Sequence, residues 1–379
     1  MKWEKKKLCE CTEYITDGDH QPAPKADKGV HFIKIKDIVD NQVSFDAQVY
    51  VPQEYYDNLP MERKPQKEDV LYTVVGSFGI PSYVQTDELF CFERNIALLH
   101  PNKDIEPRFL YYSLKNPAFY KGVEIVANGS AQKLIPLSKL KDLKISVPDK
   151  EAQRHIADIL SAYDDLIENN QKQIKLLEEA AQRLYKEWFV DLRFPGHENT
   201  KIVGGVPEGW RRGLLKELIS VNYGKDHKKA PDDGNVPVYG SGGLMRKCNK
   251  SLFSGEAVLI PRKGSLNNIM YVDETFWTVD TMFYATMKQP HTAVFVYFFV
   301  KAFDMYSMNI GAAVPSMTTK ILDAMDVVIP DKETLEKFDK LTKTYFNKIK
   351  TLQGQNERLK TARDLLLPKL MYETRKGDF

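Results

Sequence analysis

The chain has 379 residues, of which 42% are hydrophobic and 28% charged, and its formal net charge is +2. This composition is that of a globular protein of two or three domains, and the near-neutral charge gives no compositional argument for nucleic-acid binding. The N-terminal MKWEKKKLCECTEY has no apolar signal region, and the most apolar run, residues 293–300, is too short to span a bilayer. We therefore expect a cytoplasmic protein without a membrane segment.

Cysteine and histidine usage gives no sign of a metal site. Cys9, Cys11, Cys91 and Cys248 form no CxxC pair, and the seven histidines are scattered along the chain. Buried, reduced thiols are the expected state, in preference to a disulfide framework or a zinc site.

Residues 1–148 are expected to form a first globular domain of α+β type. Short strands are predicted at 30–36, 69–75, 82–84 and 95–99, separated by turn signals such as Gly76-Ser77. Residues 107–114 are predicted to form one short helix.

Residues 149–190 are predicted to form a long coiled-coil helix. Their seam positions step alternately by four and three residues, and Asn170 breaks the apolar rule. The seam consists of Ile156, Leu160, Tyr163, Ile167, Asn170, Ile174, Leu177, Ala181, Leu184 and Trp188. An apolar seam of this length needs a partner helix with a similar pattern.

Residues 330–372 supply such a partner, and a short tail, 373–379, follows them. The seam spacing recurs there, with Asn356 at one seam position. Both helices begin after the same Pro-Asp-Lys-Glu sequence, in which Asp149 and Asp331 are expected N-caps that lie 182 residues apart. The chain is therefore predicted to be an internal duplication.

Between the two helices, residues 191–210 are predicted to be a linker and residues 211–329 a second globular domain. The linker is interrupted by glycines and prolines. Strands are predicted at 236–239, 257–260, 269–272 and 282–286, and a helix at 293–303. This layout repeats that of the first domain.

We thus expect an α+β fold of two similar mixed α/β domains joined by two long helices, which pack as an antiparallel coiled coil. A buried Asn is least costly opposite another Asn, so we place Asn170 against Asn356. In that register Ala181 faces Tyr345 and Trp188 faces Phe338. The seam from Ile156 to Trp188 spans roughly 48 Å at about 1.5 Å per residue.

The sequence contains no catalytic signature. Phosphate-loop, HExxH and GxSxG patterns are absent, and Gly240-Ser241-Gly242-Gly243 is interpreted as a turn. We therefore expect a binding protein that is not an enzyme, with no metal and no cofactor of its own.

Interleaved basic, amide and hydroxyl residues on predicted loops are candidates for DNA contacts, because Lys and Arg suit phosphates whereas Asn, Gln, Ser and Arg suit base edges. For each group a solvated loop is an equally good interpretation. In the first domain the candidates are His20, Gln21, Lys34, Lys36, Ser77, Tyr83, Asn128, Ser130, Gln132 and Lys133. In the second they are Lys225, His227, Lys228, Lys229, Tyr239, Ser241, Arg246, Lys247, Asn249, Lys250, Arg262, Lys263, Ser265, Asn267 and Asn268.

Several segments, in their order and spacing, make the chain resemble the specificity subunit of a type I restriction-modification system. They are ITDGDHQ from Ile15, NGSAQKLIPLSKLKDLKISVPDKEAQ from Asn128, LYKEWFVDLRFPG from Leu184, VPEGW from Val206, VPVYGSGGL from Val236 and RDLLLPKLMYE from Arg363. The resemblance extends over almost the whole chain.

This resemblance implies that each globular domain is a target recognition domain that reads one half of a bipartite double-stranded DNA sequence. It implies that the helices set the spacer and dock two modification (methyltransferase) subunits, with restriction/translocase subunits in the full complex. S-adenosylmethionine, ATP and Mg would then be bound by the partner subunits. The alternatives are a non-DNA scaffold that joins two protein partners, and a recognition subunit that serves methylation only.

Overall fold

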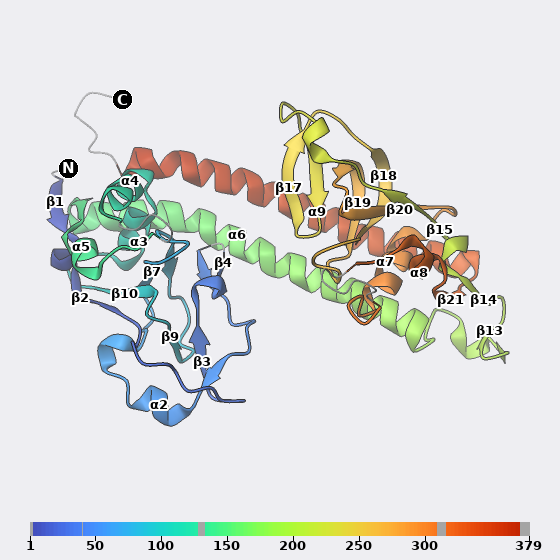
Figure 1. The fold of residues 1–379 in the computed structure, drawn as a ribbon, viewed down its shortest axis with the longest axis horizontal. Coiled ribbons are helices and arrows are strands. Elements are labelled where there is room, and N and C mark those ends of the chain that lie inside the picture. Colours follow the sequence, from blue (N-terminus) through green and yellow to red (C-terminus); the bar gives the residue numbers. More distant parts are fainter. Residues whose placement is uncertain (1–2, 40, 128–132, 309–315, 372–379) are drawn as a thin grey trace. The chain divides into compact units, whose positions relative to one another are not determined.

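The computed structural model describes residues 3–39, 41–127, 133–308 and 316–371. The chain divides into two compact units, Met1–Asn170 with Gly354–Phe379, and Gln171–Gln353. Each unit combines one globular domain with parts of two long helices, α6 (Lys150–Tyr185) and α9 (Lys332–Leu370), drawn in green and in red in Figure 1. The predicted fold class, two mixed α/β domains joined by two long helices, is confirmed.

The first globular domain contains short strands and short helices. Its strands are β1 (Glu4–Lys7), β2 (Thr12–Asp17), β3 (Val30–Ile33), β4 (Ile38–Val39), β5 (Gln42–Val43), β6 (Tyr50–Val51), β7 (Val70–Thr73), β8 (Pro81–Tyr83), β9 (Phe90–Phe92), β10 (Ile96–Pro101) and β11 (Lys144–Val147). Its helices are α1 (Leu8–Cys11), α2 (Gln53–Asp57), α3 (Pro107–Lys115), α4 (Pro117–Val126) and α5 (Leu137–Asp142), with 3-10 turns η1 (Ile35–Asp37) and η2 (Met61–Arg63).

The second unit has the larger sheet. Its strands are β12 (Ile202–Val203), β13 (Val206–Pro207), β14 (Arg211–Leu214), β15 (Ile219–Tyr223), β16 (Val236–Gly240), β17 (Gly243–Cys248), β18 (Phe253–Pro261), β19 (Met270–Thr278), β20 (Met282–Met287) and β21 (Asp326–Ile329). Its helices are α7 (Ala293–Lys301) and α8 (Thr319–Asp323), with the π-helical turn η3 (Lys186–Val190) and the 3-10 turns η4 (His197–Asn199), η5 (Leu215–Glu217) and η6 (His227–Lys229).

The two domains share one sheet topology. The strand order is β2-β10-β7-β8 in the first and β15-β20-β18-β19 in the second, where β16 and β17 extend the sheet. The registers also agree, since Val70 lies opposite Tyr83 and Val258 lies opposite Tyr271, with both residues displaced by 188 positions between repeats. The duplication therefore extends from the sequence to individual strand pairs.

Both long helices begin at the N-caps expected from the sequence. The Asp149 carboxylate accepts a hydrogen bond from the backbone N–H of Ala152, and Asp331 accepts the equivalent bond from Thr334, each over 2.9 Å. Asp331 also accepts a bond from the indole N–H of Trp210 (2.8 Å). A carboxylate at this position satisfies a free N–H group and interacts favourably with the helix dipole.

The helices pack against each other within each unit. In the first unit, Ile156 and Leu160 of α6 share a buried cluster with Leu367 of α9. In the second unit, Trp188 of η3, which continues α6, lies 5.8 Å from the ring of Phe338 on α9. This is the seam pair that the proposed register places face to face.

Several details differ from the sequence-based expectations. The described part of the first domain has five short helices, α1–α5, where one was predicted. The strand predicted at 30–36 ends at Ile33, because the backbone N–H of Ile35 bonds to the Glu93 carboxylate and the chain turns into η1. The segment 191–210, predicted to be a linker, contains the hairpin β12–β13 and a buried Trp210. Cys9 is exposed, whereas the other three thiols are buried.

No helix among the residues that the structure describes is long and apolar enough to cross a membrane.

Candidate DNA interface

In the first unit, His20 and Gln21 lie on an exposed turn after β2. The imidazole Nε2 of His20 is 3.1 Å from an Asp17 carboxylate oxygen, and the backbone N–H of Gln21 donates to Asp19 over 3.3 Å. His20 borders a cavity of about 490 Å³ together with Asp17, Arg94 and Asn95. A cation, an amide and an imidazole at one opening can contact phosphates and base edges.

Arg94 and Asn95 were not among the sequence candidates. They lie between β9 and β10, and nothing in their local sequence marks them apart from an ordinary turn. Only the fold, which brings the turn before β10 next to the end of β2, reveals their proximity to His20.

Ser77 and Lys133 are brought together although 56 residues separate them in sequence. The backbone N–H of Gly76 donates to the carbonyl of Lys133 (3.2 Å), and both candidate side chains are exposed. The Lys133 ammonium lies 5.5 Å from the centre of the Phe78 ring. Candidates Asn128, Ser130 and Gln132 lie outside the described residues, as does the side chain of Lys229.

Lys34 and Lys36 flank the start of the η1 turn, where Lys36 is exposed and Lys34 half-buried. The backbone N–H of Lys34 donates to the Asp37 carboxylate (2.9 Å), which closes the turn. The turn therefore exposes the Lys36 side chain at the surface of the first domain.

Tyr83 lies in a different environment from the other candidates. The Arg108 guanidinium stands 5.6 Å above its ring, and the ring is 6.1 Å from that of Tyr111. Burial is the main cause of its raised pKa. Tyr83 thus contributes to packing inside the domain more than to an exposed loop.

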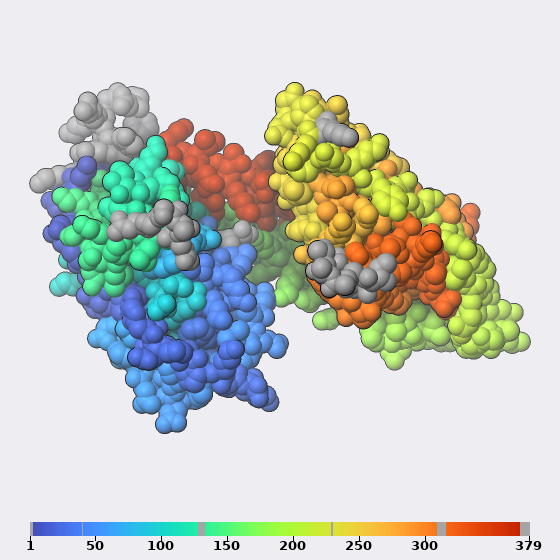
Figure 2. Space-filling model, in the orientation of Figure 1, coloured from blue at the N-terminus to red at the C-terminus, as the bar shows by residue number. Residues whose placement is uncertain are grey.

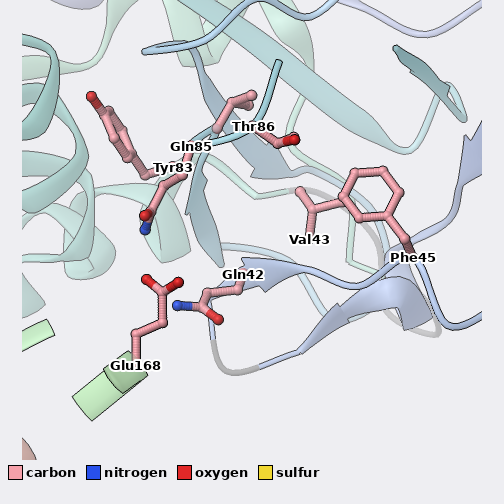
Figure 3. A pocket seen from close by; sticks show the side chains of 8 residues that line it. Gln42, Val43, Phe45, Tyr83, Gln85, Thr86 and Glu168 are labelled. Atoms are coloured by element: carbon pink, nitrogen blue, oxygen red, sulfur yellow. The ribbon is translucent and has the colours of Figure 1, made fainter. Parts of the chain in front are cut away.

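Tyr83 also borders a pocket of about 130 Å³ between the first domain and α6, shown in Figure 3. The amides of Gln42 and Gln85 and the carboxylate of Glu168 gather at one end, and Val43 and Phe45 lie at the other. Unlike the cavity beside His20, this pocket has no lysine or arginine among the described residues that line it, so it does not suit a phosphate group.

A pocket of about 540 Å³ occupies the equivalent place in the second unit. Tyr271 and Lys350, which border it, occupy the repeat positions of Tyr83 and Glu168. Tyr239, a sequence candidate, lines this pocket and donates its hydroxyl hydrogen to Glu274 over 2.5 Å. Burial, followed by this hydrogen bond, raises the pKa of Tyr239.

One group of candidates in the second unit surrounds the hairpin β16–β17, which is yellow in Figure 2 and lies at the surface of the unit. Lys225, Lys228 and Lys247 are exposed. The Arg246 guanidinium already makes hydrogen bonds within the protein, to the carbonyls of Ala230 (2.7 Å) and His227 and to the Asp232 carboxylate. The three lysines, rather than Arg246, are therefore available to phosphates.

A second group forms where the β16–β17 turn meets the β18–β19 turn. The amide of Asn268 donates to the carbonyl of Ser241 (2.8 Å), and the amide of Asn267 donates to Asp304 (3.0 Å). Lys263 and Ser265 are exposed on the same β18–β19 turn. Two turns that lie far apart in sequence thus form one polar surface.

Arg262 is positioned beside this surface by an aromatic ring. Its guanidinium lies 5.5 Å from the centre of the Tyr223 ring and donates to the carbonyl of Asp280 over 3.3 Å. Stacking on Tyr223 holds the side chain while leaving part of it exposed, which suits a contact with a phosphate. Tyr223 itself was not predicted, since only the pairing of β15 with β20 shows its neighbours.

Comparison with known families identifies the class of protein. The model of the type I restriction modification DNA specificity domain matches residues 1–179 and 207–361. The chain belongs to this family, and it is a DNA specificity subunit, the non-catalytic subunit of a type I restriction-modification system. This assignment decides against the non-DNA scaffold.

Individual relatives are similar over most of their length. The MjaIX specificity subunit of Methanocaldococcus jannaschii is 26% identical over 74% of this chain and 71% of its own. The HindI specificity subunit of Haemophilus influenzae is 23% identical over 83% of this chain and 88% of its own. The crystal structure of a type I S subunit from M. genitalium matches the fold with a TM-score of 0.63 at 19% identity, covering 99% of this chain and 97% of that one.

Proposed function

We propose that each globular domain of this subunit, residues 1–148 and residues 211–329, reads one half of a bipartite double-stranded DNA target. The observation that carries this proposal is the duplicated sheet, which has the same strand order in both units but different side chains on its loops. A repeated fold with different loop residues suits two domains that recognise two different DNA sequences.

The contacts proposed for the second half-site come from its two polar surfaces. Lys225, Lys228 and Lys247 on one, and Arg262 and Lys263 on the other, would bind phosphates and position the domain. Asn268, Ser241 and Ser265 have the hydrogen-bonding groups that read base edges. Both the amide nitrogen and the oxygen of Asn267 already bond within the protein, so its role would be to position the turn. For the first half-site the proposed contacts are His20, Gln21, Lys36, Ser77 and Lys133, with Arg94 and Asn95 added from the structure.

The long helices α6 and α9 are proposed to set the unread spacer between the half-sites and to dock two methyltransferase subunits. A seam held by side-chain packing and by the Asn170–Asn356 hydrogen bond suits a spacer of fixed length. Restriction/translocase subunits would complete the assembly. S-adenosylmethionine, ATP and Mg would then be bound by these partners, and methyl transfer and cleavage would be their chemistry.

Exchange of one domain tests this proposal. Residues 1–148 are replaced by the equivalent domain of another specificity subunit, and the methylated motif is determined with the cognate methyltransferase present. We expect one half of the motif to change while the other half and the spacer stay the same. A change in both halves would contradict the assignment of one half-site to each domain.

A further inference from the structure

Each globular domain contacts the long helices through an equivalent nine-residue helix, α3 in the first unit and α7 in the second. The residues that make these contacts differ in chemistry between the two units. The helix α3 in the first unit and α7 in the second are displaced by 186 positions, so that Tyr111 and Lys115 correspond to Tyr297 and Lys301. The lysine ammonium donates to the tyrosine hydroxyl in both units, over 3.2 Å and 2.8 Å. The hydrogen bond between lysine and tyrosine is therefore repeated in both units.

The ring packing under this helix is repeated as well. Tyr83 and Tyr111 lie 6.1 Å apart between ring centres, and their counterparts Tyr271 and Tyr297 lie 6.3 Å apart. Because the lysine–tyrosine bond and the ring contact are shared, the two attachments differ in the other residues that lie between this short helix and the long helices.

In the first unit the attachment is a charge-assisted network centred on Asp164 of α6. The Tyr112 hydroxyl donates to one carboxylate oxygen over 2.6 Å, and the Arg363 guanidinium of α9 donates to the other. Tyr112 is 1% exposed, and the side chain of Arg363 is 11% exposed. One carboxylate thus connects the globular domain to both long helices.

A second ion pair supports the same joint. The Arg108 guanidinium of α3 lies 3.2 Å from the carboxylate of Asp165, the next residue on α6. Asp165 is largely exposed, so this pair contributes little by itself. The partly buried Asp164 network is therefore the stronger of these two polar connections.

In the second unit every member of that network is replaced by an apolar residue. The counterpart of Asp164 is Phe346, that of Tyr112 is Phe298, and that of Arg363 is Ala181. The Phe346 ring lies 4.7 Å from Tyr271, 6.1 Å from Tyr297 and 6.3 Å from Phe298. This attachment is an aromatic cluster without a hydrogen bond between these counterparts.

The two attachments differ in how strictly they define the orientation of the short helix relative to the long helices. A hydrogen bond weakens when its distance or angle departs from a narrow range, and a charged partner strengthens it. Apolar contacts are nearly non-directional, so an aromatic cluster tolerates small rotations. The Asp164 network is therefore more directional than the aromatic contacts at the equivalent positions of the second unit. The polar contacts of the second domain with α9 lie elsewhere, since His291 is 2.6 Å from the Asp339 carboxylate and Lys343 is 3.3 Å from that of Glu256.

We propose that Asp164 is a positioning residue, which sets the angle of the first recognition domain on the helix pair and thereby the spacer length that the complex accepts. This inference rests on the proposed function, in which the helices separate two half-sites. Asp164 does not contact DNA in this account. It acts through Tyr112 and Arg363.

The experiment uses the full subunit assembled with its methyltransferase subunits. A set of DNA targets carries the native half-sites with spacers of native length and one base pair shorter or longer, and methylation of each target is measured. The variants are Asp164→Asn and Tyr112→Phe, which introduces the residue found in the second unit. Asp158→Asn, an exposed carboxylate on the same helix, is the matched control.

We expect the preference for the native spacer over its neighbours to fall about tenfold in Asp164→Asn and less in Tyr112→Phe, with both half-sites still required. The control should keep the preference of the unmodified subunit. Equal losses at all spacer lengths, as expected for mere destabilisation, would overturn the proposal, and so would an unchanged preference in both variants. Tyr112→Phe keeps the Asp164–Arg363 pair and remains informative if Asp164→Asn does not fold.

The unmodified subunit reports on the proposed function separately. Loss of its methylation when either half-site is removed supports the bipartite target, whatever the variants show. Methylation of a single half-site by the unmodified subunit would overturn the proposed function and, with it, the role of Asp164 in spacer selection.

Discussion

The hydrogen bond between Asn170 and Asn356 leads to a quantitative prediction about stability. The Asn170 amide donates to the Asn356 oxygen over 2.8 Å, and the two residues are 7% and 6% exposed. Changing only Asn170 to Leu leaves the Asn356 amide in an apolar seam without this partner, at a cost of about 1–3 kcal/mol. Changing both residues removes both polar groups, so the double variant should recover most of that loss.

A double-mutant cycle measures this coupling. The free energy of unfolding is obtained from urea denaturation followed by far-UV circular dichroism for Asn170→Leu, Asn356→Leu and the double variant. The loss in the double variant should be smaller than either single loss, so it should fall short of their sum by at least about 1–3 kcal/mol. Asn169→Leu, at an exposed position beside Asn170, controls for helix propensity. Additive losses would refute the paired arrangement.

Two further predictions concern charged residues. Replacing Arg262 and Lys263 by Ala should weaken DNA binding by the assembled complex. It should also lower the slope of log affinity against log salt concentration by about 2, because two phosphate contacts are lost. Fluorescence anisotropy at several salt concentrations measures the slope, and an unchanged slope would show that neither residue contacts DNA. Burial lowers the pKa of Lys115 to about 8 from 10.5, so the unfolded chain holds more protons between these pH values and stability should rise with pH across them. Lys115→Met should therefore be more stable than the unmodified protein below pH 8, and this advantage should shrink toward pH 10.5. Urea denaturation midpoints across this pH range measure the difference in stability. A difference that does not change with pH would contradict the lowered pKa of Lys115 as its cause.

The long helices were predictable because their signals are local and repeated. The seam spacing, the Asp149 and Asp331 caps and the two seam asparagines are all visible in the sequence. The strand pairs of the globular domains were harder to predict, because buried strands such as Phe90–Phe92 are short and do not alternate between apolar and polar residues. Residues 4–14, which form β1, α1 and part of β2, carry no clear period.

The candidate interface was only partly predictable for a different reason. Basic and amide residues on loops are visible in sequence, but their exposure and partners depend on contacts between distant loops. Arg246 has the same local sequence character as Lys247, yet its guanidinium is occupied by carbonyl groups of a neighbouring loop. Arg94 becomes a candidate only because the fold places it beside His20.

The most direct test of the central claim is the methylome of a host that expresses this chain with its cognate methyltransferase subunit, compared with the same host lacking this chain. We predict a new methylated motif in two specific halves, separated by a spacer of fixed length, that is present only with the chain. A methyltransferase that is active with another specificity subunit but yields no new motif with this one would contradict the account.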